Sequence, residues 1–293
     1  MEWKSRVTEL LGCKYPIFQG AIAHLGGWKF ATAVAEAGAH GTITASLSRT
    51  PEQLRKDIIN CRESTSGSFG VNFSIGICPR IEEMLDVCIE ERIPIETSVY
   101  KPDALANRIK DSGLPWIHKA ARIKDAIHAQ EVGADAIILV GLEGAGIKNP
   151  EQLPTLTTIT WGRKFIKVPL IAAGGIADAH GFLAAMSMGA DGIMMGSAFM
   201  ATRECPLNEA NKRKIVALNP GDPELRKYVM TPTQLRTPGE PADIPHDIDW
   251  SKVVSFATGS IDRVMTVKEL VEGIVSGAGE IINGWGFATR ITK

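Results

Sequence analysis

The chain has 293 residues, with 32 basic and 33 acidic side chains and a formal net charge of −1 at pH 7. This balance gives no long-range attraction for nucleic acid or for an anionic membrane surface, so we expect neither as a partner. The five cysteines form no C-x-x-C pair and have no histidine at zinc-ligand spacing, which favours reduced thiols over a metal site. The sequence shows no export signal and no uninterrupted apolar span, so we expect a cytoplasmic protein.

Eight short apolar runs alternate with helical patterns through the first part of the chain. The predicted strands are residues 15–20, 40–45, 69–75, 93–99, 115–120, 135–141, 168–175 and 191–197. They are largely apolar rather than alternating, which is typical of parallel strands buried on both faces. Several of the helical patterns end at glycine just before the next strand, where a helix is expected to stop.

This alternation predicts the α/β class and a single (β/α)8 TIM barrel over residues 1–205. A doubly wound sheet is the alternative, but it needs a switch in strand order that the sequence does not indicate. Residues 206–293 contain a polar, proline-rich stretch at 231–250 and then the helical pattern VKELVEGIVSGAGEII. We interpret them as a C-terminal extension whose loop and helices pack on the barrel or cover its mouth, as a lid or as a plain surface excursion.

Glycines follow the last two predicted strands. Gly174 and Gly175 end the seventh strand, and Gly196 with Ser197 ends the eighth, each before a helical pattern. In TIM barrels these two loops often bind phosphate, because glycine lets backbone N–H groups approach the anion and a helix N-terminus adds partial positive charge. The pattern favours a phosphate-bearing ligand over ordinary tight turns.

Polar residues also lie at the ends of other strands. Asn72 closes the third strand, Glu96 lies in the fourth, and His118 and Lys119 close the fifth. An amide or a charge inside an apolar barrel needs a partner, so these positions are candidate ligand contacts. Lys119 could neutralise an anionic ring or substrate at the barrel mouth. The alternative is that Lys119 is an ordinary surface lysine just past the strand. His118 points the other way from its neighbour, and we interpret it as structural.

Seven segments, in chain order, resemble the FMN-dependent nitronate monooxygenases, formerly called 2-nitropropane dioxygenases. They are YPIFQG at 15–20, GVNF at 70–73, IETS at 95–98, IHK at 117–119, GLEGAG at 141–146, IAAGGIAD at 171–178 and MGADGIMMGSAFMATRE at 188–204. The superfamily also includes the flavin-dependent enoyl-acyl-carrier-protein reductases. The resemblance covers about residues 10–210, and it implies an oxidoreductase with FMN across the barrel mouth and a small-molecule substrate.

The resemblance also implies which residues contact the cofactor. They would be Gly20, Ala21, Ile22, Asn72, Lys119, Ala145, Gly146, Ala173, Gly174, Gly175, Met195, Gly196 and Ser197. By the family's pattern, the backbone at 20–22 lies along the flavin, and the glycines with Ser197 hold the phosphate. A positive charge at Lys119 beside the ring would favour its acceptance of electrons.

One position departs from the family. The loop after the sixth strand usually carries a histidine as the base beside the substrate, and here Ile147 takes that place. Isoleucine cannot accept a proton, so removal of a nitroalkane's α-proton would lose a contribution of about 10²- to 10⁴-fold. Nitronates are already deprotonated and need this help less.

His24, on the loop after the first strand, is the candidate that replaces the histidine. We predict that it is catalytic and that it contacts the substrate together with Ile147, although a loop histidine that caps local backbone is the alternative. Lys148 and His246 are weaker candidates, because nothing in the sequence fixes their positions.

The predicted function is FMN-dependent oxidation of a nitronate or a similar activated carbon acid. Two alternatives remain open: a flavin-dependent acyl-thioester reductase or dehydrogenase, for which the apolar wall at Ile147 is acceptable, and a catalytically silent flavin-binding module. The sequence leaves open NAD(P)H or oxygen as the redox partner, and a homo-oligomer. It has no dinucleotide-binding glycine fingerprint, so NAD(P)H would only visit the flavin face.

Overall fold

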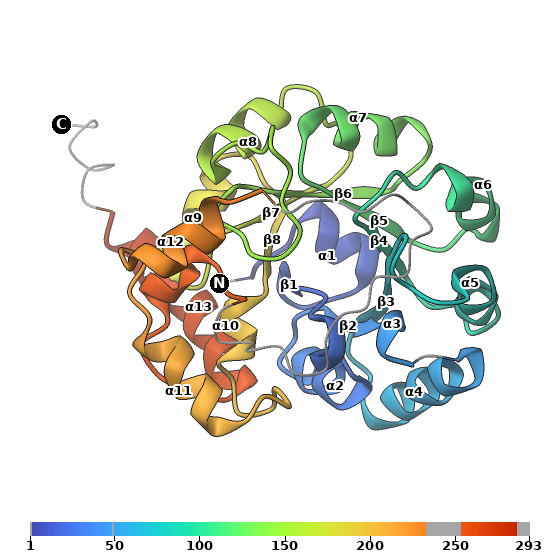
Figure 1. Cartoon of the computed structure of the whole chain (residues 1–293), viewed down its shortest axis with the longest axis horizontal. Coiled ribbons are helices and arrows are strands. Elements are labelled where there is room, and N and C mark those ends of the chain that lie inside the picture. The colour runs from blue at the N-terminus through green and yellow to red at the C-terminus, as the bar shows by residue number, and fades with distance from the viewer. Residues whose placement is uncertain (1, 49, 233–252, 286–293) are drawn as a thin grey trace.

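The computed structural model describes residues 2–48, 50–232 and 253–285. Eight parallel strands form one sheet that curls into a ring, with helices around its outside (Figure 1). The strands are β1 Ile17–Gln19, β2 Gly41–Thr44, β3 Phe69–Ser74, β4 Ile95–Ser98, β5 Trp116–Ala120, β6 Ala136–Val140, β7 Leu170–Ala173 and β8 Gly192–Met195. Each lies within one of the eight predicted runs.

The ring closes between its first two strands. The strand order is β1-β8-β7-β6-β5-β4-β3-β2, and a parallel bridge between Phe18 and His40 then joins β1 to the residue before β2. At this bridge Gln19 N donates to His40 O at 3.0 Å, and His40 N donates to Ile17 O at 2.8 Å. The predicted (β/α)8 barrel is therefore confirmed, and the doubly wound alternative is excluded.

Helices cover the outside of the ring. They are α1 Arg6–Leu11, α2 Trp28–Glu36, α3 Ala45–Ser48, α4 Pro51–Ser64, α5 Ile81–Glu90, α6 Asp103–Ser112, α7 Ile123–Glu131, α8 Thr155–Gly162, α9 Ala179–Ser187, α10 Ser197–Met200, α11 Glu209–Ala217, α12 Pro223–Met230 and α13 Val267–Asn283, with short 3₁₀ turns η1 Ala23–Leu25 and η3 Phe256–Ser260. Among the helices of the described segments, none is long and apolar enough to cross a membrane.

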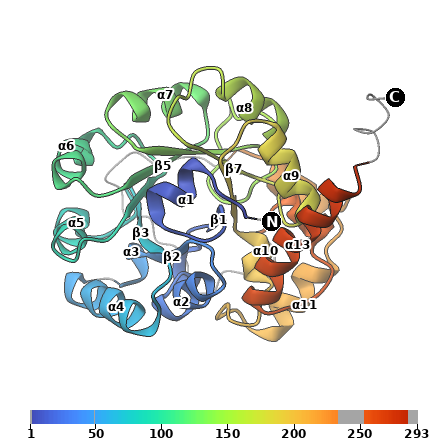
Figure 2. The same cartoon turned by 180° about the vertical axis from the view of Figure 1, so that it is seen from behind.

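Successive residues of each strand face opposite sides of the barrel wall. Phe18, Ile117 and Met194 belong to a buried apolar cluster inside the barrel, whereas their neighbours Ile17 and Ile193 pack with the surrounding helices. Both faces are apolar, which explains why the strands form unbroken apolar runs in the sequence. Val7 of α1 joins the inner cluster, so α1 plugs one end of the barrel, as the view from behind shows (Figure 2).

The C-terminal segment contributes a helix to the outer ring. Helix α13 packs against α9 and α2 (Figure 2), with Leu270, Val271 and Ile274 buried on its inner face. A capping box of Thr266 and Glu269 starts this helix by satisfying its first backbone N–H groups. The division of the chain at residue 205 stays a prediction. Most of the proline-rich stretch proposed as a lid, including His246, lies outside the described residues.

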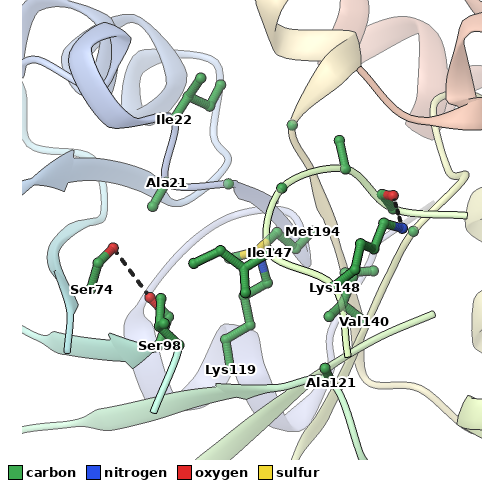
Figure 3. Close-up of a pocket in the computed structure, with 18 of the residues that line it drawn as sticks. Ala21, Ile22, Ser74, Ser98, Lys119, Ala121, Val140, Ile147, Lys148 and Met194 are labelled. Atoms are coloured by element: carbon green, nitrogen blue, oxygen red, sulfur yellow. Dashed lines mark hydrogen bonds between the residues drawn. The ribbon is translucent and has the colours of Figure 1, made fainter. Parts of the chain in front are cut away.

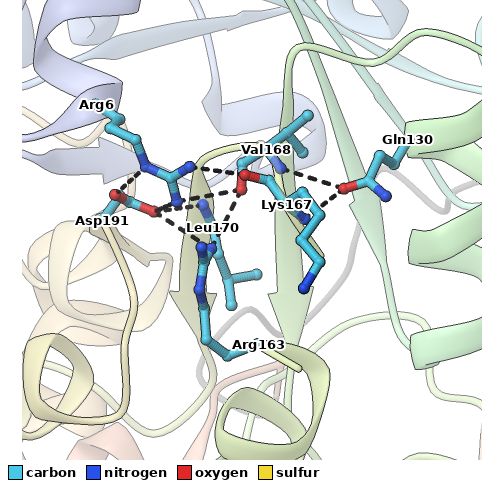
Figure 4. A network of polar contacts seen from close by, with 7 residues as sticks. All are labelled: Arg6, Gln130, Arg163, Lys167, Val168, Leu170 and Asp191. Carbon is cyan, nitrogen blue, oxygen red and sulfur yellow. Dashed lines mark hydrogen bonds and ion pairs between the residues drawn. The ribbon is translucent and has the colours of Figure 1, made fainter. Parts of the chain in front are cut away.

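A polar network ties α1 to the entrances of β7 and β8 (Figure 4). Arg6 donates from Nε and Nη2 to the two carboxylate oxygens of Asp191 at 2.8 and 2.6 Å, and from Nη1 to Lys167 O at 2.7 Å. Asp191 also accepts from Leu170 N at 2.9 Å. This geometry holds the plug helix against two neighbouring strands at the end of the barrel opposite its mouth.

Replacing Arg6 by alanine is expected to lower the free energy of unfolding by about 1–2 kcal/mol, because a two-pronged charged hydrogen bond is lost. The Arg6 side chain is 41% exposed, so solvent screening keeps the effect in this range. Urea denaturation measures it. Lys4→Ala removes a neighbouring pair with Glu2 that is almost fully exposed, and it should leave stability unchanged. Equal losses in the two variants would contradict the role given to Arg6.

Candidate functional site

A cavity of about 640 Å³ opens at the carboxyl ends of the strands (Figure 3). All eight strands contribute to its wall: Gly20 after β1, Ser46 after β2, Asn72 in β3, Ser98 in β4, Lys119 in β5, Val140 in β6, Ala173 in β7 and Met194 in β8. This is the end at which TIM barrels carry their active sites, because loops from every strand converge there.

Nearly all of the predicted site residues meet in this cavity. It is lined by Gly20, Ala21, Ile22, Asn72, Lys119, Ala145, Gly146, Ile147, Ala173, Gly174, Gly175, Met195, Gly196 and Ser197. His24 differs: it lies in η1 next to Ala23, and Ala23 lines the cavity, but His24 is absent from the part of the wall that the described residues build. The roles of these residues stay predictions.

The loop after β7 requires glycine. Gly174 and Gly175 have φ angles of 105° and 75°, in the left-handed region that residues with a Cβ avoid. A Cβ on Gly174 would come within 2.9 Å of Thr155 Oγ1 and 3.0 Å of Gly141 O, so the space beside it is already filled. The backbone here can approach a ligand closely, which no larger residue would permit.

The loop after β8 completes this cradle. Ser197 begins α10, and its Oγ accepts a hydrogen bond from Ser255 N at 2.9 Å. The hydroxyl proton of Ser197 therefore remains available for an anion in the cavity. The exposed main chain on both loops and this hydroxyl together fit the phosphate of a mononucleotide.

The loop after β6, residues 141–149, is fixed by two charged residues. Glu143 Oε2 accepts from both the backbone N and Oγ1 of Thr155 at 2.7 Å, which holds the loop against the start of α8. Lys148 is 2% exposed, and its Nζ donates to the carbonyl oxygens of Leu142 and Gly144. Burial lowers the pKa of Lys148 to about 8. Both charged groups thus hold the loop in place, and the residues between them, Ile147 included, line the cavity.

A polar cluster lies beneath the cavity. Figure 3 shows Lys119 rising from β5 toward Ile147, and the buried Glu96 of β4 accepts from Thr42 Oγ1 at 3.0 Å. Burial raises the pKa of Glu96 to about 7. Burial also lowers the pKa of Lys119, and the nearby charge of Glu96 opposes this shift. The lysine in the cavity floor therefore lies near a buried carboxyl group that gains a proton readily.

The neighbouring His118 has a structural environment. Its Nδ1 lies 2.8 Å from Thr97 Oγ1, which also accepts from Trp116 Nε1 at 2.9 Å. Burial lowers the pKa of His118 to about 4, so the ring is neutral at physiological pH. This agrees with the structural interpretation drawn from its position in the strand, although part of the residue reaches the cavity wall.

The carboxyl group of Glu96 should make stability depend on pH. Its pKa is about 7 in the folded protein against an ordinary 4.5, so the stability that it contributes is complete below pH 4.5 and is lost as the pH rises through 7. Glu96→Gln cannot ionise. The advantage of wild type over this variant in unfolding free energy is therefore expected to decrease as the pH rises from 4.5 to 7. Urea denaturation at a series of pH values measures it. A difference independent of pH would contradict the assignment.

Some residues of the wall were not predicted. Ser74 and Ser98 line it from the ends of β3 and β4, where the rule that strand ends carry ligand contacts could have found them. Tyr228, Val253 and Ser255 come from the C-terminal segment, and no sequence signal places them there.

The barrel and the cavity at its strand ends are those of a TIM-barrel protein with a ligand site at its mouth. The family described as nitronate monooxygenase has a sequence model that matches residues 4–77 and 77–232. The chain belongs to the nitronate monooxygenase family and is a flavin-dependent oxidoreductase. A probable nitronate monooxygenase of Staphylococcus aureus (strain MSSA476) is 29% identical, with 73% of this chain and 72% of the relative covered.

Two solved structures are similar over nearly the whole chain. FabK from Thermotoga maritima has a TM-score of 0.81 and 27% identity, with 96% of this chain and 98% of the other covered. Nitroalkane oxidase from Streptomyces ansochromogenes has a TM-score of 0.74 and 20% identity, with 96% and 99% covered, and this likeness shows the fold alone. The similarity to FabK supports the relation to the enoyl-acyl-carrier-protein reductases.

Proposed function

We propose that the protein is an FMN-dependent oxidoreductase that oxidises a nitronate or a similar activated carbon acid. The observation that carries this proposal is the meeting of the glycine cradle of β7 and β8 with Lys119 in one cavity. The cradle suits the terminal phosphate of FMN, and bound FMN would supply an acceptor for two electrons from the substrate.

Other residues of the chain would position the ring and the substrate. Asn72 is oriented by its neighbours, because Ser74 Oγ lies 3.2 Å from its Oδ1 and Ser98 Oγ lies 3.4 Å from its Nδ2. Lys119 would attract an anionic substrate to the floor of the cavity. Ile22 and Ile147 make an apolar wall that excludes water. Because this wall holds no base at Ile147, a substrate that arrives already deprotonated is favoured.

A second candidate is the reduction or dehydrogenation of an acyl thioester. The similarity to FabK over 96% of the chain supports it, as does the apolar wall at Ile147, which suits a bulkier substrate. NAD(P)H would then be the reductant, whereas oxygen would reoxidise the flavin in the first candidate.

An anaerobic reduction screen of the purified protein tests these candidates. We expect the protein to be yellow, to release FMN on denaturation, and to lose its visible absorbance when an alkyl nitronate is added. Bleaching by NAD(P)H or by a saturated acyl thioester, without bleaching by a nitronate, would favour the second candidate. If no donor reduces the bound flavin, both candidate functions are contradicted. A catalytically silent flavin-binding module would then be the remaining interpretation.

A further inference from the structure

Tyr228 places a phenol hydroxyl beside the loop that follows β6. It lies on α12, lines the cavity and packs against the core with its ring partly buried. The backbone N of Gly146 donates to the Tyr228 hydroxyl oxygen at 3.4 Å. Gly146 directly precedes Ile147, and both residues line the same cavity. A polar group from the C-terminal segment thus lies next to the position at which this chain has isoleucine.

The proton of this hydroxyl points to a donor function. A phenol has one proton to donate besides the lone pairs with which it accepts. Here the oxygen accepts from Gly146 N, and within the described part of the chain the proton has no acceptor of its own. The 3.4 Å bond is longer than the usual 2.9–3.0 Å, so it restrains the hydroxyl only weakly.

The surroundings of the ring keep the phenol neutral. Burial raises the pKa of Tyr228 above its ordinary value of 10, and the contact with Gly146 N offsets only part of this rise. The group therefore holds its proton throughout the physiological range. It can donate a hydrogen bond, but it is a poor base for removing a proton from a carbon acid.

We propose that the Tyr228 hydroxyl donates a hydrogen bond to an oxygen atom of the substrate at the wall where Ile147 offers none. This inference rests on the proposed function and narrows its substrate class. The substrate would carry an anionic or carbonyl oxygen one or two bonds from the reacting carbon, with its alkyl part against Ile147 and Ile22. A nitronate oxygen suits the site well, because charged acceptors form the stronger hydrogen bonds.

Tyr228→Phe tests the proposal, because it keeps the ring and removes the hydroxyl. Isobutyrate serves as an unreactive probe with a planar pair of anionic oxygens, and its binding is followed by the change it causes in the flavin spectrum. We expect binding of isobutyrate to weaken about tenfold or more and KM for an alkyl nitronate to rise in parallel. The affinity for FMN and the melting temperature should change little.

Three further variants separate a direct contact from a structural role. Tyr15→Phe removes a hydroxyl just before β1, outside the cavity wall, and should bind isobutyrate like wild type. Glu143→Gln loosens the same loop through Thr155 but keeps the Tyr228 hydroxyl, so it should not reproduce the selective loss. Adding Ile147→His to Tyr228→Phe supplies a new donor and should restore part of the binding.

The outcomes that would overturn the proposal are distinct. Isobutyrate binding unchanged in Tyr228→Phe, or an equal fall in FMN affinity, would overturn it. The proposal would also be overturned if His24→Ala lost isobutyrate binding and Tyr228→Phe kept it. That result would assign the contact to His24. Wild-type protein that binds isobutyrate but reacts with no nitronate would overturn the proposed function alone.

Discussion

Gly174→Ala is expected to give a folded protein that loses its flavin. The residue has a φ angle of 105°, and the new Cβ would lie 2.9 Å from Thr155 Oγ1 and 3.0 Å from Gly141 O. The loop after β7 would have to move away from its present path, which would withdraw its backbone N–H groups from the proposed phosphate site. A loss of a few kcal/mol corresponds to an FMN dissociation constant raised by about 100-fold or more. Fluorescence titration of the flavin-free protein measures it.

A matched control separates backbone strain from loss of the cradle. Gly113 also has a positive φ, 65°, but a Cβ there would meet nothing within 4 Å. It follows α6 and precedes β5, at the end of the barrel away from the cavity. Gly113→Ala should therefore lower the melting temperature without changing FMN affinity. Retention of wild-type FMN affinity by Gly174→Ala would refute the proposed phosphate site.

Lys119→Met is expected to have the largest effect on the rate. The substitution removes the cation from the cavity floor and leaves Glu96 beneath it without this charge. Losing one preorganised charge at a reacting centre commonly costs about 10²- to 10³-fold in rate. We expect a fall of this size in the rate of flavin reduction by a nitronate, together with a more negative flavin reduction potential. Anaerobic stopped-flow mixing and spectroelectrochemical titration measure the two quantities.

Two variants show whether charge causes this effect. Lys119→Arg keeps the positive charge in a different shape and should recover part of the rate. Because Lys119 lowers the pKa of Glu96, its removal should raise that pKa further. Adding Glu96→Gln to Lys119→Met should then restore stability at alkaline pH but not the rate. A reduction rate in Lys119→Met close to that of wild type would rule out the electrostatic role.

Much of the fold follows from local rules that the sequence obeys. The eight strands were predictable because both of their faces are apolar, and the glycine loops because only glycine adopts their backbone conformation. The inward orientation of Lys119 and the outward orientation of His118 follow from the alternation of side chains along β5. These features depend on residues close together in the chain.

Other features depend on contacts between distant residues. Helix α13 follows a long polar stretch, and nothing in its sequence specifies that it packs between α9 and α2. The short helices α1, α11 and α12 also escaped prediction. Tyr228 reaches the cavity through the packing of α12, which strand-end rules cannot foresee. His24 was chosen for its closeness to β1 in sequence, but it lies in the 3₁₀ turn η1, where Ala23 rather than His24 lines the described part of the cavity wall.

We expect detachment of α13 from the barrel to weaken the binding of flavin. Helix α13, residues 267–283, packs against α2, residues 28–36. Most of the chain lies between these two helices in sequence, so their contact closes a long loop. Upstream of α13 and η3, Ser255 N donates to Ser197 Oγ beside the proposed phosphate site. Transient detachment of α13 would expose apolar faces of α9 and α2 and would also release this hydrogen bond. Flavin-saturated protein should accordingly protect the amides of α13 from hydrogen exchange better than protein stripped of flavin.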